Sequence, residues 1–335
     1  MVGEASFSMQ LSILVPVYKQ AKVLRKFLNA MQHQDAQDFE IVIVLDSNIE
    51  NNLAVLDSFR LFFKNRIALV YNTRRIGRTK ALQEAIEKAS SEYVLITSSS
   101  NFFARDAVSQ LLKLIKNKPA DIIEFRAPMR SPISFKGKIR QNQPQQVNLV
   151  DRPEVVAYSY PFDFNKIYRR EILSNSSLEA EIRQTVNSRF AINFFLSAWG
   201  KARTYVNSDL KIVRLRNDLF SEVTPLSIAK QWVEWRKAFE KNGPAKYAAE
   251  LDYLSFYHLS VILAGFVTAT DNARLKEKYR QFLQNQWTTT TNLVLKPIPT
   301  FAGKIRKLKR FARRLVGMNI LSCIGHFKLS HAKSK

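Results

Sequence analysis

The sequence predicts an α/β protein with a doubly wound, mixed or parallel sheet, followed by a helical C-terminal region. Over the first 126 residues, short apolar runs alternate with longer segments whose apolar residues recur every three or four positions. The short runs are apolar at consecutive positions, as strands are when helices cover both faces of a parallel sheet. From about residue 226 onwards the helical pattern predominates. Alternation of this kind is typical of doubly wound folds.

Five strands are predicted in the first part of the chain, with four helices between them. The strand-like runs, among them LSILVPV and FEIVIVLD, cover 11–17, 39–46, 67–71, 92–97 and 121–125. The segments with helical spacing cover 23–31, 53–63, 78–89 and 105–115. This order predicts that the strands run parallel to one another.

The rest of the chain differs in composition. Residues 127–160 contain four prolines and the polar run RQNQPQQ, which together predict a long loop. Mixed structure follows over 161–225. We therefore expect an α/β half (1–126), a second half that carries the long loop (127–225) and a helical basic region (226–335).

The composition favours a folded protein of a reducing compartment. The chain of 335 residues is 46% hydrophobic and 24% charged, which argues against overall disorder. Cys323 is the single cysteine, so an intrachain disulfide and a cysteine-based zinc site are excluded. The first residues show no signal-peptide pattern, and the apolar stretch 254–270 contains His258 and several hydroxyl groups. We therefore expect a cytoplasmic protein in which 254–270 is a buried helix.

The charge balance predicts an anionic partner. The chain carries 52 basic and 28 acidic residues, a formal net charge of +24. Acidic residues end at Glu277, whereas residues 278–335 hold 13 lysines and arginines. Such a field attracts phosphorylated ligands, anionic lipid or nucleic acid.

Candidate binding residues lie where the predicted strands end. Ligands of doubly wound sheets bind at the carboxyl ends of the strands. In this sequence those ends carry Pro16 and Tyr18, then Asp46, then residues 72–80, then residues 98–101. We expect these loops to meet at the rim of one binding site.

The third of these loops is strongly basic. Its sequence, NTRRIGRTK, places Arg74, Arg75, Arg78 and Lys80 at or before the start of a helix. Guanidinium groups and helix N-termini both bind phosphate, so a phosphorylated ligand is predicted. A solvated surface charge is the alternative for each side chain. The glycine fingerprint of dinucleotide-binding folds and the Walker pattern are both absent, which argues against dehydrogenases and P-loop enzymes.

The order and spacing of four blocks over roughly 11–225 resemble family 2 glycosyltransferases. The blocks are SILVPVYKQ, DFEIVIVLDSN, GRTKALQEAI with KASSEYVLI, and FNKIYRREIL. The resemblance implies a GT-A fold that binds a nucleoside-diphosphate sugar, with a UDP-sugar as the expected donor. It places Tyr18 near the base and Asp46 on the carboxylate that accepts a hydrogen bond from the uracil imide. Strand-end packing for Tyr18 and a turn or cap role for Asp46 are the alternatives.

Two departures from the family pattern concern the chemistry. The family's D-x-D motif, which holds a divalent Mg²⁺ or Mn²⁺ ion on the diphosphate, is replaced by Ser98 and Ser100, followed by Asn101. The slot of the catalytic base holds Val186 and Asn187, neither of which accepts a proton near neutral pH. A shifted alignment would place Glu179 or Glu181 there instead.

These departures leave three functions open. The chain is a transferase in which the basic loop replaces the charge of the metal, with a lipid or envelope polymer as acceptor. Alternatively it is an inactive binding or scaffold subunit on the same fold. A third interpretation is a basic protein that binds anions or nucleic acid, although no nucleic-acid recognition motif is present.

A basic amphipathic helix is predicted near the C-terminus. In FAGKIRKLKRFARRLVGMNIL, apolar residues recur at helical spacing, among them Phe301, Ile305, Leu308 and Leu315. The other face carries seven lysines and arginines, including Arg310, Arg313 and Arg314. Such a helix binds anionic membrane surfaces, so we expect peripheral attachment to the inner face of the cell membrane. Packing on the body of the protein and nucleic-acid binding are the alternatives.

Overall fold

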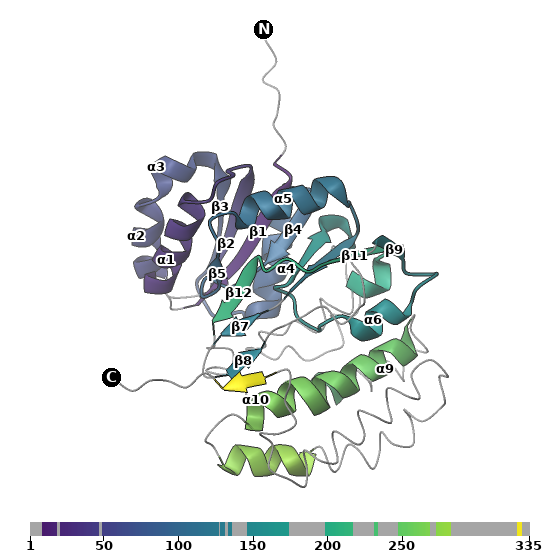
Figure 1. Ribbon diagram of the computed structural model, residues 1–335. Helices are drawn as coiled ribbons and strands as arrows, with labels where there is room; N and C mark the ends of the chain where they lie inside the picture. The colour runs from purple at the N-terminus through teal and green to yellow at the C-terminus, as the bar shows by residue number, and fades with distance from the viewer. Residues whose placement is uncertain are drawn as a thin grey trace.

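The computed structural model describes most of the α/β core and part of the C-terminal region. The described residues are 9–18, 21–46, 49–126, 128–130, 133–135, 146–173, 198–216, 231–233, 247–268, 273–282 and 327–329. Figure 1 shows an α/β core above a group of helices from the last third of the chain.

An eight-stranded mixed sheet forms the centre of the molecule. Its strands, in spatial order, are β3 (Ile67–Asn72), β2 (Phe39–Asp46), β1 (Leu11–Val17), β4 (Tyr93–Ile96), β10 (Lys166–Arg169), β6 (Ile122–Phe125), β11 (Thr204–Ser208) and β9 (Gln146–Asn148). All are parallel except β10 and β9, which run against their neighbours. The predicted doubly wound mixed sheet is confirmed, and it takes strands from both sides of residue 126.

Both faces of the sheet are covered, which explains the continuous apolar strands. On one face lie α1 (Ala21–Gln32), α2 (Ile49–Asp57) and α5 (Ala107–Asn117). On the other lie α4 (Arg78–Lys88) and α6 (Glu154–Tyr158), and α9 (Ala248–Tyr257) packs against α6. Every residue of β2 is buried, because its side chains enter the two cores alternately. Each fully buried aliphatic side chain contributes about 1.5–3 kcal/mol relative to an exposed one.

The predicted elements of the first 126 residues are present, with one subdivision. The single helix expected over 53–63 is two helices, α2 and α3 (Arg60–Phe63). A turn at Ser58 and Phe59 separates them, and the hydroxyl of Ser58 donates to the carbonyl of Ala54 at 3.0 Å. A serine that bonds back to the preceding turn competes with the helical backbone.

The prediction of a long loop over 127–160 is wrong for the described parts of this segment. These contain β7 (Met129–Arg130), β8 (Ile133–Phe135), β9 and α6. Strands of two or three residues are too short to show an alternating pattern in the sequence. The prediction therefore rested on the prolines, which favour a loop. Pro153 is itself the residue before α6, where its fixed φ suits the start of a helix. β7 and β8 belong to a second sheet, whose strand order is β13 (Phe327–Leu329), β8, β7, β12 (Val213–Arg216) and β5 (Phe102–Phe103).

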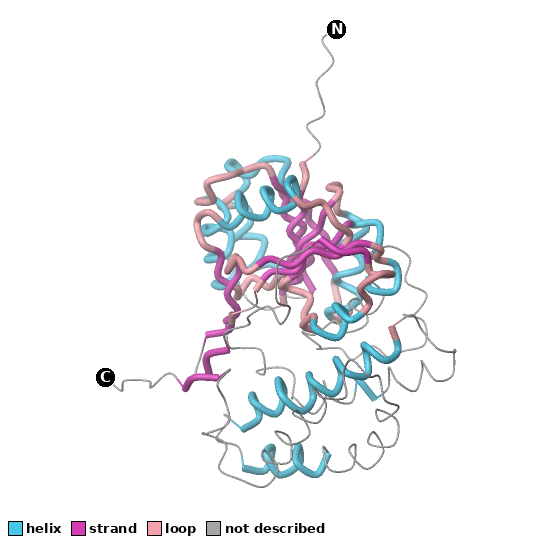
Figure 2. The backbone as a smooth tube through the Cα atoms, turned by 45° about the vertical axis from the view of Figure 1, so that its right-hand side comes forward, coloured by secondary structure: helices cyan, strands magenta, loops and turns pink. Residues whose placement is uncertain are grey.

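The buried helix predicted over 254–270 is confirmed in its described part, 254–268. α9 continues into a π-helical segment (His258–Leu263) and α10 (Ala264–Thr268), and a further helix covers 273–282. Figures 1 and 2 both place these helices together on one side of the sheet. His258 is fully buried, and its Nδ1 accepts a hydrogen bond from the indole of Trp232 at 2.8 Å. In the described part of the chain, every helix is too short or too polar to span a bilayer.

Candidate functional site

The loops that carry the predicted site residues lie at one edge of the sheet. β1, β2, β3 and β4 are parallel, so the segments that follow them share the carboxyl edge. β10 runs the opposite way, and the residues that precede it therefore lie at this edge too. In Figure 1 the chain enters β1 from the top, and the carboxyl edge faces α9 and α10. The candidate site is built at this edge.

Asp46 ties the end of β2 to the basic loop. Its Oδ1 accepts the backbone N–H of Ile76 at 2.7 Å, and its Oδ2 accepts that of Gly77 at 3.0 Å. Gly77 has φ 85°, a conformation that favours glycine, and the chain turns there into α4. The carboxylate is buried, with 5% of the residue exposed. This geometry supports the turn role that the sequence left open, while the contact with uracil stays a prediction.

Tyr18 and Arg75 meet across the first and third loops. The guanidinium carbon of Arg75 lies 4.2 Å from the centre of the Tyr18 ring. A cation–π contact of this kind contributes about 0.5–1 kcal/mol at an exposed site. Arg74 and Lys80 are exposed on the same basic segment, and Pro16 lies next to Val44 of β2. The structure thus brings together predicted nucleotide-binding residues that are far apart in sequence.

Arg78 forms an ion pair that the sequence did not predict. Its Nη2 donates to Oδ2 of Asp163 at 2.7 Å, with 13% of the Arg78 side chain and 1% of the Asp163 side chain exposed. Within the described structure, Nε of Arg78 and Oδ1 of Asp163 are buried and have no hydrogen-bond partner. The charge of Arg78 is therefore already opposed by a carboxylate.

A buried acid, Glu124 of β6, fixes the segment before β10. Its Oε2 accepts the hydroxyl of Ser159 at 2.5 Å and that of Tyr205 at 2.9 Å. Its Oε1 accepts the backbone N–H of Tyr160 at 3.0 Å and the side-chain amide of Asn165 at 3.1 Å. A buried carboxylate with four hydrogen-bond donors is well satisfied and rigid.

Lys166 completes this network from the other side. Its fully buried ammonium donates to the carbonyls of Tyr160 and Phe162 at 2.5 and 2.9 Å, and to Oδ1 of Asn165 at 2.9 Å. It also lies 3.5 Å from Oε1 of Glu124. Residues 159–165 are thereby held from both ends, with the carboxylate that pairs with Arg78 between them.

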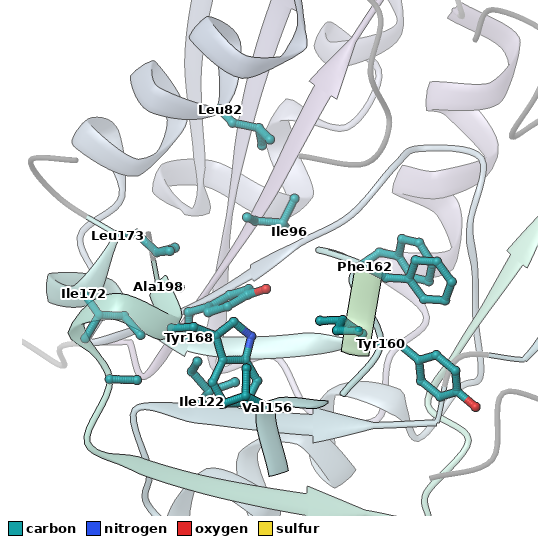
Figure 3. Close-up of a cluster of buried hydrophobic side chains, with 14 of the residues drawn as sticks. Leu82, Ile96, Ile122, Val156, Tyr160, Phe162, Tyr168, Ile172, Leu173 and Ala198 are labelled. Atoms are coloured by element: carbon teal, nitrogen blue, oxygen red, sulfur yellow. The ribbon is translucent and has the colours of Figure 1, made fainter. Parts of the chain in front are cut away.

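Tyr168 is a further buried polar group on the same face of the sheet. Burial raises the pKa of its hydroxyl well above the usual value, and the nearby charges of Asp163 and Glu124 raise it further. The hydroxyl is buried and unpartnered in the described structure. Figure 3 shows Tyr168 among the buried side chains of Ile96, Ile122 and other residues of this core.

The segment after β4 does not fit a divalent cation. The hydroxyls of Ser98 and Ser100 lie 3.0 Å apart and bond to each other, and the amide nitrogen of Asn101 donates to Thr97 at 3.0 Å. Mg²⁺ and Mn²⁺ at phosphate sites are usually bound through one or two carboxylates of the protein, and this segment has none. Over the described ranges, no three acidic, histidine or cysteine side chains are grouped as a metal site.

Several predicted residues lie outside the described structure. They are the base slot at Val186 and Asn187, the alternatives Glu179 and Glu181, and the whole membrane-binding segment from Phe301 to Leu315. Their roles stay predictions.

The sequence analysis did not predict Asp163, Glu124 or Lys166 as residues of the site. The signal for Asp163 was present, because an acidic residue stands among aromatic ones just ahead of FNKIYRREIL. Its partner Arg78 is 85 residues away, and β10 reaches that partner only because it enters the sheet in the reverse direction.

Comparison with known proteins settles the family. Residues 12–176 match the family model Glycosyl transferase family 2. This part of the chain is a family 2 glycosyltransferase domain. The match spans β1 to β10 and includes Tyr18, Asp46, the basic loop and Asp163.

Two of the similar proteins are named for the transfer of a sugar to poly(ribitol phosphate). The chain is 23% identical over 198 residues to a poly(ribitol-phosphate) β-N-acetylglucosaminyltransferase, TarS, of Staphylococcus aureus, covering 57% of this chain and 33% of TarS. It is 21% identical over 194 residues to a poly(ribitol-phosphate) β-glucosyltransferase of Bacillus spizizenii, covering 57% of this chain and 30% of that protein. The chain therefore spans about a third of the length of these curated relatives.

A solved structure confirms the fold. A fragment of S. aureus TarS in complex with UDP-GlcNAc superposes with a TM-score of 0.59 at 18% identity, covering 92% of this chain and 88% of the fragment. At this identity the likeness establishes the GT-A fold of the chain.

Proposed function

We propose that this protein binds a UDP-sugar at the carboxyl edge of its sheet and transfers the sugar to an envelope polymer. The observation that carries the proposal is the basic loop, which Asp46 holds at that edge within a family 2 domain. The polymer acceptor is inferred from the activities for which the two relatives are named.

Binding of the diphosphate rests on the cationic side chains of the loop. Arg74, Arg75 and Lys80 are exposed there and offer positive charge to the phosphates of the donor. Cationic side chains also stabilise the negative charge that develops on a departing diphosphate. A metal-independent donor site follows, since the hydroxyls of Ser98 and Ser100 are poor metal ligands.

A specific observation favours a second candidate, a subunit that binds the nucleotide sugar without transferring it. Carboxylates are missing both from the D-x-D slot at Ser98 and Ser100 and from the base slot at Val186 and Asn187. A hydroxyl acceptor needs a group that removes its proton.

Calorimetric titration tests the binding, and a turnover assay separates the two candidates. UDP and UDP-GlcNAc are titrated with Mn²⁺ and then with EDTA, and the expected affinity is the same in both conditions. Loss of binding in EDTA would contradict the metal-independent site, and no binding in either condition would contradict the donor site itself. Release of UDP in the presence of poly(ribitol phosphate) identifies a transferase, whereas binding without release identifies the binding subunit.

A further inference from the structure

Three buried polar atoms on the α4 side of the sheet have no protein partner. Within the described structure they are Nε of Arg78, Oδ1 of Asp163 and the hydroxyl oxygen of Tyr168. An unsatisfied buried donor or acceptor costs about 1–3 kcal/mol, so such groups are normally paired with protein, water or ligand. The first two belong to one ion pair, joined by the 2.7 Å contact between Nη2 and Oδ2. One donor and one acceptor of the same ion pair are therefore each left without a hydrogen bond.

The charge of this pair selects the kind of group that completes it. A phosphate on Nε of Arg78 would stand next to the carboxylate of Asp163, and like charges repel at this range in a poorly solvated site. A neutral hydroxyl accepts a hydrogen bond from an N–H and donates one to a carboxylate oxygen at the same time. The pair is therefore complementary to an alcohol and not to an anion.

The pair is also rigid, as a recognition site must be. Asp163 is only 1% exposed, and its loop is held by the buried ammonium of Lys166 through the carbonyls of Tyr160 and Phe162. Arg78 is fixed by its place at the start of α4, directly after Gly77, whose N–H Asp46 accepts. Groups fixed in this way lose little conformational entropy when a ligand binds.

We propose that Arg78 and Asp163 form a hydroxyl-binding subsite of the carboxyl edge, which accepts a hydroxyl of a sugar or sugar alcohol. This inference rests on the proposed function, because it supplies the contact to the sugar where the exposed arginines supply the contact to the diphosphate. The residues of the basic loop then have two different roles. Arg74 and Arg75 contact phosphate, while Arg78, neutralised by Asp163, contacts a hydroxyl. The hydroxyl comes from the donor sugar or from the polyol of the acceptor.

Two conservative variants test the subsite. Asp163→Asn removes the charged acceptor, and Arg78→Lys retains a cation beside Asp163 but lacks Nε. UDP, UDP-glucose and UDP-GlcNAc are titrated by calorimetry into the wild type and each variant. For a donor subsite, affinity for UDP stays within twofold, whereas the affinity for both UDP-sugars falls about tenfold, the effect of one lost hydrogen bond to a charged group. Glu277→Gln, in an exposed ion pair with Arg280, is the matched control and leaves all affinities unchanged.

Deoxy analogues distinguish recognition from support of the fold. UDP-glucose analogues that each lack one sugar hydroxyl are titrated into the wild type and Asp163→Asn. One analogue binds the wild type about tenfold more weakly than UDP-glucose and binds the variant no more weakly, because the lost contact is already absent. A merely structural role for Asp163 would weaken all analogues equally and would overturn the proposal.

Titration with poly(ribitol phosphate) tests whether the hydroxyl belongs to the acceptor. Unchanged UDP-sugar binding together with about tenfold weaker polymer binding in both variants places the hydroxyl on the acceptor. Unchanged binding of both ligands means that the pair holds only water, and overturns the inference. If the wild type does not bind UDP, the proposed donor site is refuted. The titration with poly(ribitol phosphate) then tests the hydroxyl-binding subsite by itself. Circular dichroism checks folding, and if Asp163→Asn does not fold, Arg78→Lys decides the outcome alone.

Discussion

The carboxylate of Asp46 accepts two backbone N–H groups of the basic loop, so a single side chain determines the position of several cations. Asp46→Ala leaves both donors without their partner. We expect the free energy of unfolding to fall by about 2–5 kcal/mol, because each hydrogen bond to a charged group contributes about 1.5–3 kcal/mol. Affinity for UDP falls with it, because the loop is no longer held in place.

Urea unfolding and calorimetric titration with UDP measure these two effects. Asp57→Ala, an exposed aspartate at the end of α2, is the control and changes neither quantity. A loss of stability below about 0.5 kcal/mol for Asp46→Ala would show that the two hydrogen bonds do not hold the loop.

Because the hydroxyl of Tyr168 is buried, we expect the folded protein to lose stability at alkaline pH. Burial, together with the charges of Asp163 and Glu124, raises the pKa of Tyr168 in the folded protein, whereas in the unfolded chain a tyrosine ionises near pH 10. Above that pH the unfolded state binds fewer protons, so the free energy of unfolding decreases as pH rises. The contribution of this tyrosine is fully present below pH 10 and decreases by about 1.4 kcal/mol for each pH unit above it.

Urea unfolding at pH 9 and pH 11 checks this prediction. Tyr168→Phe reduces the difference in stability between the two pH values by about 1.4 kcal/mol, since phenylalanine does not ionise. Tyr71→Phe, at a position that is 62% exposed, serves as the control. An identical pH dependence for Tyr168→Phe and the wild type would contradict the assigned role of burial.

At the scale of elements, the segment before β10 depends on one buried cation. Lys166 donates to two carbonyls and to Asn165, and lies beside Glu124, with both charged side chains at most 1% exposed. Lys166→Met preserves much of the side-chain volume but leaves a buried carboxylate and two carbonyls without this donor. Breaking a buried pair in this way costs about 3–5 kcal/mol, and the same loss is expected here in urea unfolding.

Lys113→Met, at an exposed position of α5, is the control and leaves stability within about 0.5 kcal/mol of the wild type. A Lys166→Met protein as stable as the wild type would show that the network does not fix this segment. If the variant folds, we also expect weaker UDP-sugar binding, because Asp163 lies in the segment that Lys166 holds.

At the scale of the whole molecule, positive charge is concentrated near the C-terminus, where residues 278–335 hold 13 lysines and arginines and no acidic residue. We predict that the segment 301–315 binds anionic membranes through its lysines and arginines. Neutralising Arg310, Arg313 and Arg314 to glutamine removes about 3 kcal/mol of surface attraction, at about 1 kcal/mol for each basic side chain. Binding to vesicles that contain phosphatidylglycerol, measured by co-sedimentation, falls about a hundredfold.

The control removes the same charge from the body of the protein. It replaces three exposed lysines with glutamine: Lys22, Lys113 and Lys116. If both triple variants lose binding equally, net charge and not the C-terminal segment attracts the protein to the membrane. Vesicles of phosphatidylcholine alone show whether the attraction is electrostatic.

Local patterns determined the α/β core and the position of the basic loop. A strand buried on both faces must be continuously apolar, and an amphipathic helix must repeat every three or four residues, so β1 to β4 and the helices between them could be predicted. The exceptions are short elements: β7 and β8 have too few residues to carry a period, and the turn at Ser58 divides a helix that periodicity alone continues.

The sequence by itself determined the fold class, the carboxyl-edge site, the resemblance to family 2 and the absence of carboxylates at Ser98 and Ser100. Only the tertiary structure decided that Asp46 supports the loop through backbone hydrogen bonds and that Arg78 is neutralised by Asp163. The reason is physical. Periodicity and composition are local properties of the chain, whereas the pairing of a buried charge depends on which strand lies beside which. Here that pairing arises because β10 enters the sheet antiparallel and carries Asp163 to the edge where α4 begins.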